Sequence, residues 1–431
     1  MTSWIPTTKT TNIDSVKEKR FFPIQSSTAC QSKWAWSSLF LNRGTSHSCH
    51  RASTSKLTVD NFYNFHNTDV KVNDRLLMLS GKWPTGGCTY CKNIETSGGF
   101  SDRMLHNTIP DLYPAELDAD INSTVVSPTI LEVFFDSTCN LSCVYCGPEI
   151  SSKIADEYRK FGAFDQHGVQ LIPAPATNTA ELQQQFWLWM QTNFRSLKRF
   201  HFLGGEPFLQ KEFGTLLEFI EANPNPDCEI NFITNLMLPH GRFAEQIDRI
   251  KSLVARRKLK RLDLTASIDC WGPEQEYIRH GLKLDQWTQN FEYLLNQRWI
   301  KLQINQTISS LSIKAMPDLL VRLEQWNKVR PVGHFFSVTE PGPSYLRPNI
   351  FGPGVFDKDF DIILSLMGNG TDQERNAIKY MTGIANEIEN SSINEQEIKK
   401  LFVFLHENDR RRNTNWETLF PWLMEFQQHV V

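Results

Sequence analysis

Residues 131–146 of the chain spell LEVFFDSTCNLSCVYC, an apolar run followed at once by three cysteines. The continuous apolar residues Val133–Phe135 are typical of a parallel strand that is buried on both faces. The short loop after this strand brings the sulfurs of Cys139, Cys143 and Cys146 toward one point. Three thiolates occupy three corners of a four-iron cluster, so one iron would stay open to a substrate or cofactor.

Short runs of β-branched and aromatic residues continue along the chain and alternate with longer helical patterns. The predicted strands are residues 131–136, 199–205, 229–235, 262–269, 301–309 and 334–340, and the predicted helices are residues 179–196, 213–222, 242–257, 284–297 and 314–327. Strands that alternate with helices predict parallel βαβ units with right-handed crossovers. The sequence therefore predicts an α/β fold, a partial (β/α)6 TIM-like barrel over residues 126–345 that lacks the last two repeats and has an open side.

The cysteine loop resembles the C-x3-C-x-aromatic-C motif of the radical S-adenosylmethionine superfamily, with Tyr145 in the aromatic place. The resemblance extends over roughly residues 20–345 and implies a 4Fe-4S cluster on Cys139, Cys143 and Cys146. In that family the open iron binds the amino and carboxylate groups of S-adenosylmethionine. Reductive cleavage then releases a 5'-deoxyadenosyl radical that abstracts hydrogen from the substrate. The alternative is a zinc loop, although zinc sites usually pair cysteines as C-x2-C.

The second predicted strand ends in Gly204, Gly205, Glu206 and Pro207. Two glycines let the backbone approach a ligand closely, and a carboxylate at a strand end can pair with an ammonium group. The tetrapeptide resembles the GGEP motif of the same superfamily, which implies contact with the amino group of the methionine moiety.

Further polar residues follow the later strands. By resemblance, Ser267 and Asp269 lie near the ribose hydroxyls, and Arg279 pairs with the cofactor carboxylate through its planar fork. Each of these three residues is equally compatible with a helix cap or a surface charge. Asn305 is the preferred candidate on the fifth strand, because a polar residue in an apolar strand needs a partner. The remaining candidates at the same mouth are Thr307 and Glu340.

Residues 1–125 show little regular periodicity and contain four of the nine cysteines: Cys30, Cys49, Cys88 and Cys91. Four thiolates suit a fully ligated site, which predicts a structural or electron-relay centre. The pattern C-x13-G-x4-C that starts at Cys30 resembles the opening half of SPASM and Twitch auxiliary-cluster domains, which implies a second 4Fe-4S cluster. Those domains usually follow the barrel, whereas these cysteines precede it. Zinc remains the alternative.

Several residues near these cysteines in the sequence can be interpreted in two ways. Trp34 and Trp36 either shield the site from water or form ordinary core. His50 is either a ligand or a turn cap, and residues 95–103 form either a loop that faces a cluster or a solvated turn.

The composition limits the partners and the compartment. A net charge of -3 lacks the basic excess expected of a protein that grips nucleic acid through its phosphates. No apolar run is long enough to cross a bilayer, and grouped cysteines favour a reducing compartment, so the sequence predicts a cytoplasmic protein. Cys228 and Cys270 lie outside both groups and are predicted to be buried apolar residues.

Residues 346–431 are predicted to form a helical extension with a break near 390–395. An apolar set at helical spacing predicts a packing face on this extension, namely Trp416, Phe420, Trp422, Leu423 and Phe426.

The resemblance implies a radical enzyme that acts with S-adenosylmethionine and an electron donor such as flavodoxin or ferredoxin. By analogy with relatives that carry auxiliary domains, the first candidate substrate is a peptide or protein side chain. The second is a small molecule such as a nucleotide or sugar. A hypothesis from another class is a zinc-binding interaction protein on a degenerate barrel.

Overall fold

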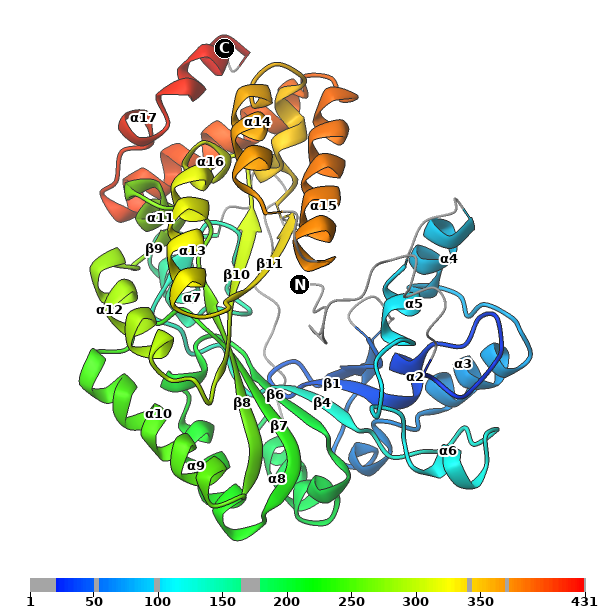
Figure 1. Cartoon of the computed structure of the whole chain (residues 1–431). Coiled ribbons are helices and arrows are strands. Elements are labelled where there is room, and N and C mark those ends of the chain that lie inside the picture. The colour runs from blue at the N-terminus through cyan, green and yellow to red at the C-terminus, as the bar shows by residue number, and fades with distance from the viewer. Residues whose placement is uncertain are drawn as a thin grey trace.

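A nine-stranded sheet is the central feature of the computed structural model, which describes residues 21–49, 54–96, 101–163, 179–338, 343–368 and 372–429 (Figure 1). The strands follow one another across the sheet in the order β11 (Gly333–Val338), β10 (Lys301–Ile308), β8 (Leu259–Ser267), β7 (Asn225–Thr234), β6 (Arg199–Leu203), β4 (Ile130–Phe134), β1 (Trp36–Phe40), β2 (Thr45–His47) and β3 (Ser55–Lys56). Neighbours from β11 to β1 are parallel, whereas β1, β2 and β3 are antiparallel. The described residues therefore form a mixed α/β structure with a large parallel sheet.

Helices connect the parallel strands, and several of them cover one face of the sheet (Figure 1). The connecting helices are α7 (Ser152–Phe161), α8 (Thr179–Asn193), α9 (Lys211–Ala222), α10 (His240–Ala255), α11 (Pro273–Ile278), α12 (Leu284–Leu295) and α13 (Met316–Val329). In α10, Phe243, Ile247, Ile250 and Leu253 recur at helical spacing and are all buried. The six predicted strands and five predicted helices are thus confirmed, with ends shifted by a few residues.

The N-terminal part of the chain contributes a strand to the main sheet, which the sequence did not predict. Strand β1 lies parallel to β4, with Leu39 opposite Val133. Ser37 and Ser38 interrupt the apolar pattern of β1, but the hydroxyl of Ser38 donates a hydrogen bond to Glu132 of the neighbouring strand. The missed strand was therefore hidden by polar residues whose partners lie far away in the sequence.

The N-terminal helices lie to the side of β1, at the right of Figure 1, and a buried arginine joins two of them. They are α2 (Gln31–Ala35), α3 (Asp69–Leu79), α4 (Cys88–Thr96), α5 (Asp102–His106) and α6 (Glu116–Ala119). Arg75 is fully buried and donates hydrogen bonds to the carbonyl oxygens of Lys33, His66 and Thr124. A single guanidinium thus links α3 to α2 and to the segment that leads into β4.

One face of the sheet carries a row of polar side chains at the same register position of five adjacent strands. The row consists of Ser38, Glu132, His201, Asn231 and Asp263, each opposite the next, and all five are buried. The indole of Trp36 stacks on the imidazole of His201, with ring centroids 5.7 Å apart. Trp36 lies two residues before Ser38 on β1, and residues two apart on a strand share a face. Trp36 is therefore on the face that bears the row.

His201 makes the fold sensitive to acid. Burial lowers the pKa of His201 to about 3, so protonation below the unfolded pKa near 6.5 favours the unfolded chain. The contribution of neutral His201 to stability is present above pH 6.5 and is lost as the pH falls toward 3. From pH 6.5 to pH 4.5, we expect the free energy of unfolding to fall by about 2–3 kcal/mol more in the wild type than in His201→Gln.

Urea unfolding at the two pH values measures this difference. His406→Gln is the matched control, because His406 is exposed on α16 (Glu395–Arg412), and this variant should follow the wild type. Parallel pH profiles for the wild type and His201→Gln would contradict the prediction.

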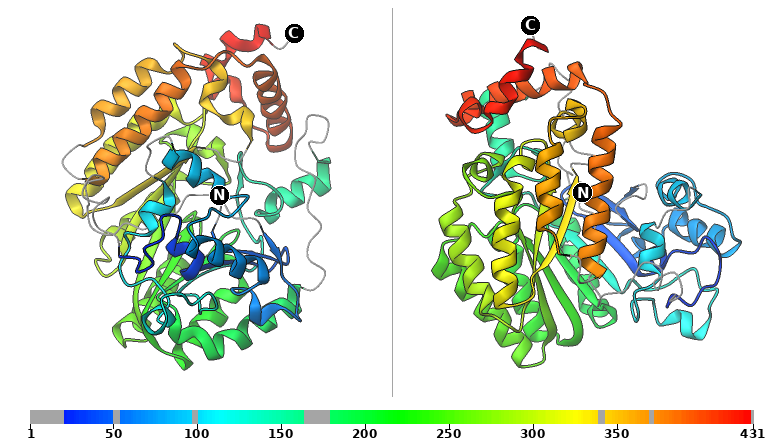
Figure 2. Two further views of the ribbon diagram at one scale, coloured as in Figure 1. Left: turned by 90° about the vertical axis from the view of Figure 1, so that its right-hand side faces the viewer. Right: turned by 45° about the horizontal axis from the view of Figure 1, so that its top comes forward.

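The C-terminal part of the chain is helical, and Figure 2 shows it from two further sides. It contains α14 (Asp357–Leu366), α15 (Asp372–Glu389), α16 and α17 (Trp416–Leu419), and the break between α15 and α16 falls where the sequence predicted it. Short 3-10 helices lie at Phe62–Asn64, Phe194–Ser196, Pro207–Leu209, Ile313–Ala315, Ser344–Leu346, Pro348–Phe351 and Pro421–His429. The predicted apolar set is a packing face, since four of its members are buried and Trp422 contacts the rings of Phe351 and Phe356.

Helix α16 is tied to α7, the helix that follows the cysteine loop. The guanidinium of Arg412 pairs with the carboxylate of Glu157 at 3.0 Å, and both side chains are largely buried. Removing one partner of such a pair leaves the other charge buried without compensation. We expect Arg412→Ala to lower the free energy of unfolding by about 3 kcal/mol.

The neighbouring residue Arg410 provides the control for this prediction. It pairs with Glu407 on the same helix, but its side chain is 55% exposed, so Arg410→Ala should lower the free energy of unfolding much less than Arg412→Ala does. Chemical denaturation measures the loss in the free energy of unfolding for both variants. Equal losses for Arg410→Ala and Arg412→Ala would show that the buried ion pair to α7 adds no more stability than the exposed pair.

No helix within the described ranges combines the length and the apolar character needed to cross a membrane.

Candidate functional site

The cysteine loop follows the carboxyl end of β4. The carboxyl ends of the neighbouring parallel strands lie at the same edge of the sheet. Its centre forms the short strand β5 (Ser142–Cys143), which pairs with β9 (Arg279–His280). The amide of Cys139 donates to the hydroxyl of Ser152 at 3.1 Å, at the start of α7. The loop is therefore attached both to the helix that follows it and to the segment after β8.

The three thiols of the loop act on one another electrostatically. Burial and, to a smaller extent, the neighbouring Cys143 together raise the pKa of Cys139 to about 12. A hydrogen bond between the thiols of Cys143 and Cys146 lowers the pKa of Cys143, and the guanidinium of Arg279 acts in the same direction. Three thiols without a fourth cysteine in the loop are the donor type of a cluster with one open iron. In this structure, however, neither these side chains nor any other group of three or more His, Cys, Asp or Glu among the described residues is arranged to hold a metal ion.

The Gly-Gly-Glu-Pro turn after β6 packs directly on the cysteine loop. The amide of Glu206 donates to the carbonyl of Thr138 at 2.7 Å, and the amide of Gly205 donates to the carbonyl of Asp136. A methyl group at position 205 would lie 2.2 Å from the carbonyl oxygen of Thr138. Glycine is thus required at position 205 by the close approach of the two backbones.

The carboxylate of Glu206 is buried and accepts three hydrogen bonds. The donors are the hydroxyl of Thr234 and the amide of Asn235, both at 2.7 Å, and the amide of Phe208 at 3.4 Å. Burial raises the pKa of Glu206 to about 7, although these hydrogen bonds act in the opposite direction. The turn is therefore connected to the end of β7 through this carboxylate, while Pro207 begins a 3-10 helix beneath it.

Asn235 is a site residue whose role the sequence did not predict. Its amide nitrogen donates to the side-chain oxygen of Asn140 at 2.8 Å and lies 3.9 Å from the sulfur of Cys139. The only sequence signal was its position at the end of a predicted strand. A donor next to a ligating sulfur is one of the features that set the potential of an iron–sulfur cluster.

Ser267, the last residue of β8, lies beside Asn305 of β10. They are register partners, both are buried, and the carbonyl of Asn305 accepts from the amide of Ile268. The backbone of Thr307 is also part of the site, since its amide donates to the carboxylate of Asp269. Glu340 and His50 lie outside the described residues.

Asp269 and Arg279 are at the same mouth, but they bind each other. Two nitrogens of the Arg279 guanidinium lie 2.8 Å from the two carboxylate oxygens of Asp269. The hydroxyl of Tyr145 donates to the same carboxylate at 2.7 Å. Tyr145, Asp269 and Arg279 thus contact one another in the structure, whereas the sequence indicated only that they lie at the same edge of the sheet.

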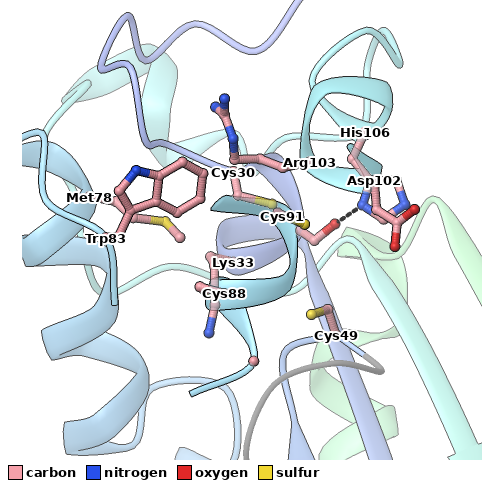
Figure 3. Close-up of a pocket in the computed structure, with 12 residues that line it drawn as sticks. Cys30, Lys33, Cys49, Met78, Trp83, Cys88, Cys91, Asp102, Arg103 and His106 are labelled. Atoms are coloured by element: carbon pink, nitrogen blue, oxygen red, sulfur yellow. Dashed lines mark hydrogen bonds between the residues drawn. The ribbon is translucent and has the colours of Figure 1, made fainter. Parts of the chain in front are cut away.

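The four N-terminal cysteines line one cavity of about 30 Å³ (Figure 3). Cys30 comes from the segment before α2, Cys49 follows β2, and Cys88 and Cys91 lie on the first turns of α4. Burial and the other three thiols together raise the pKa of Cys30 to about 12. Four thiols are the donor type of a fully ligated metal or cluster, although these side chains are not arranged around a common metal position in this structure.

Cationic side chains surround this cavity. Lys33 is buried and pairs with Asp74 at 2.6 Å, while Arg103 lies over the ring of Trp83 (Figure 3). Although burial lowers the pKa of Lys33, the thiols of Cys88 and Cys49 together with Asp74 raise it above its ordinary value. Buried cations of this kind stabilise a negatively charged group at the centre.

The structure also places the flanking residues of the N-terminal group. Trp34 is buried in the small core that includes Cys30, and its indole donates to the carbonyl of Ser123. Asp102 and Arg103 line the cavity, so the end of the predicted 95–103 loop faces the cysteines. Residues 97–100 lie outside the described residues. Cys228 and Cys270 are fully buried in the main core, which confirms their predicted role.

Comparisons with known proteins give similar solved structures, whereas no family model and no curated protein sequence matches the chain. Native anSMEcpe with bound AdoMet and Kp18Cys peptide is 15% identical, with a TM-score of 0.33 over 64% of this chain and 66% of that chain. SuiB from Streptococcus suis, bound to precursor peptide SuiA, is 14% identical, with a TM-score of 0.35 over 85% of this chain and 71% of that chain. TYW1 with a lysine-pyruvate adduct is 17% identical, with a TM-score of 0.26 over 56% of this chain and 69% of that chain. The chain thus spans 66% of the length of the first of these proteins.

Proposed function

We propose that the chain is a radical S-adenosylmethionine enzyme that generates a 5'-deoxyadenosyl radical and abstracts hydrogen from a substrate. The observation that carries the proposal is the attachment of the cysteine loop to the Gly-Gly-Glu-Pro turn, with Glu206 hydrogen-bonded to Thr138. The two motifs that the resemblance identifies are thereby in backbone contact, although about sixty residues separate them in the sequence.

Cys139, Cys143 and Cys146 would hold a 4Fe-4S cluster, which supplies the electron for cleavage of S-adenosylmethionine when it is bound. The residues from Gly204 to Pro207 would approach the methionine moiety through their backbone, and Ser267 and Asn305 would contact the nucleoside. Because Glu206, Ser267 and Asn305 are buried, they orient polar groups of the cofactor in a site that excludes water. The chain's own task is thus binding and orientation.

The domain organisation proposed with this function has three parts. Residues 126–345 would form the partial (β/α)6 barrel of the radical core, and residues 346–431 a helical extension. Residues 1–125 would form an auxiliary unit similar to SPASM and Twitch domains, in which Cys30, Cys49, Cys88 and Cys91 hold a second 4Fe-4S cluster. The buried Lys33 beside these thiols supports an anionic cluster, and zinc is the alternative occupant.

The proposed substrate is a peptide or protein side chain, and a nucleotide or sugar is the small-molecule alternative. SuiB is described with a bound precursor peptide, and anSMEcpe with a bound peptide. We propose a cytoplasmic location, where a flavodoxin or ferredoxin would donate the electron.

Anaerobic reconstitution with iron and sulfide tests the proposal. About eight iron and eight sulfide per chain support two 4Fe-4S clusters, and about four of each support one. The reduced protein should then convert S-adenosylmethionine to 5'-deoxyadenosine. Zinc without sulfide would favour a zinc-binding interaction protein. An intact cluster that yields no 5'-deoxyadenosine would defeat the enzyme assignment.

A further inference from the structure

We propose that Tyr145, Asp269 and Arg279 form a buried clasp that positions the cysteine loop. This inference rests on the proposed function, and it assigns Asp269 and Arg279 a positioning role in place of the direct cofactor contacts that the resemblance implied. The clasp joins the loop after β4 to the segments that follow β8.

The carboxylate of Asp269 is the centre of the clasp, and its oxygens are already engaged. It accepts from two nitrogens of Arg279 at 2.8 Å, from the hydroxyl of Tyr145 at 2.7 Å and from the amide of Thr307 at 2.8 Å. A carboxylate offers about four lone-pair sites, so these four hydrogen bonds use its capacity. The side chain is also fully buried. A ribose hydroxyl would have to displace one of these partners to reach it.

Arg279 holds the loop in two ways. Its backbone pairs with that of Cys143, and its guanidinium lies 5.3 Å from the ring centroid of Tyr145. The amide of Val144 also donates to the carbonyl of Ile278, the residue before Arg279. The ion pair with Asp269 therefore fixes the residue that pairs with Cys143 in the middle of the cysteine loop.

Tyr145 connects the clasp to the cysteines themselves, because it lies between Cys143 and Cys146 in the sequence. Its hydroxyl crosses to the carboxylate of Asp269, so the loop cannot rotate about its end without breaking a hydrogen bond to a buried charge. Such hydrogen bonds are stronger than those between neutral groups.

The anchor of the clasp is itself immobilised. The side-chain oxygen of Gln275 accepts from the amides of Asp269 and Cys270, both at 2.9 Å. The side-chain nitrogen of Gln306 donates to the carbonyl of Asp269 at 2.5 Å, and its oxygen lies 2.9 Å from the imidazole of His334. Side chains from β10 and β11 thus hold the backbone of Asp269 in place, as expected for residues that support a ligand set.

The test compares Tyr145→Phe and Arg279→Lys with two matched controls. Tyr345→Phe removes the hydroxyl of another buried tyrosine, which packs against Phe404. Asp263→Asn neutralises a buried aspartate in the middle of β8 that pairs with Arg261 and Lys301, and it is the control for Asp269→Asn. Two quantities are measured: the rate at which an iron chelator removes the cluster, and the dissociation constant of S-adenosylmethionine for protein that still holds its cluster.

We expect the three clasp variants to lose the cluster about tenfold faster than the wild type, because each loses a hydrogen bond to a buried charge. Their dissociation constants for S-adenosylmethionine should stay within about threefold of the wild-type value, since a positioning residue does not touch the cofactor. The controls should lose the cluster at the wild-type rate. A variant Arg279→Lys with a wild-type cluster lifetime but much weaker cofactor binding would overturn the proposal and identify a direct ligand.

Hydrogen exchange of the metal-free protein separates this inference from the proposed function. Tyr145→Phe should accelerate amide exchange in residues 139–146, whereas Tyr345→Phe should not. Unchanged exchange in Tyr145→Phe would refute the clasp. A wild type that takes up no iron or sulfide would instead refute the proposed function, and the exchange result would still decide on the clasp.

Discussion

Replacement of Cys143 by alanine is expected to lower the formation of 5'-deoxyadenosine by more than about a hundredfold, the upper range for residues that only support a ligand. Cys143 is the buried central cysteine of the loop, its backbone pairs with Arg279, and its thiol shares a hydrogen bond with that of Cys146. Without this sulfur, two cysteines remain, too few to leave a single open iron on a stable cluster. Iron and sulfide content, together with product detection by chromatography, measure the effect.

Cys228→Ala is the matched control for this experiment. Cys228 is fully buried on β7 and belongs to neither cysteine group, so its loss should cost about 1 kcal/mol of stability and leave the cluster intact. Wild-type product formation in Cys143→Ala would remove the basis of the proposed chemistry.

The second large effect is expected from a single methyl group in the turn after β6. In Gly205→Ala the new Cβ would lie 2.2 Å from the carbonyl oxygen of Thr138, 2.6 Å from its carbonyl carbon and 2.7 Å from the carbonyl oxygen of Ser137. These atoms belong to the backbone next to Cys139, so no side-chain rotation can relieve the overlap. We expect the cysteine loop to be displaced, with a loss of about 1–3 kcal/mol in the free energy of unfolding and with most of the loop cluster missing.

Gly214→Ala tests whether this effect is specific to the close approach. Gly214 lies within α9 and a Cβ there meets nothing within 4 Å, so alanine should stabilise the protein by about 0.5–1 kcal/mol. Iron content and thermal unfolding of the two variants provide the comparison. A Gly205→Ala protein with full iron content would show that the two backbones can separate without consequence for the site.

The sequence predicted most of the parallel sheet because its strands are buried and therefore carry a local signal. Runs such as Phe200–Leu203 are apolar apart from His201 and lie between amphipathic helices, so period and composition alone identify them. Strand β1 has no such signal. Ser38 is buried beside Glu132 of β4 and Ser37 beside His66, and a buried polar residue has the same appearance in a sequence as an exposed one.

The same reasoning separates the two parts of the candidate site. The identity of the thiols, and the glycines that allow a backbone to approach, depend on residue type and short spacing, which the sequence contains in full. The sequence also placed Asp269 and Arg279 at the mouth, but it did not indicate that they bind each other.

The sequence alone thus determined which residues can serve as ligands and how strands and helices alternate, because both depend on a few consecutive residues. The tertiary structure decided which buried polar groups are partners: Asp269 with Arg279 and Tyr145, Glu206 with Thr234, and Arg412 with Glu157. Such pairs are selected by the packing of distant segments, since a buried charge must find a partner wherever the fold brings one within reach.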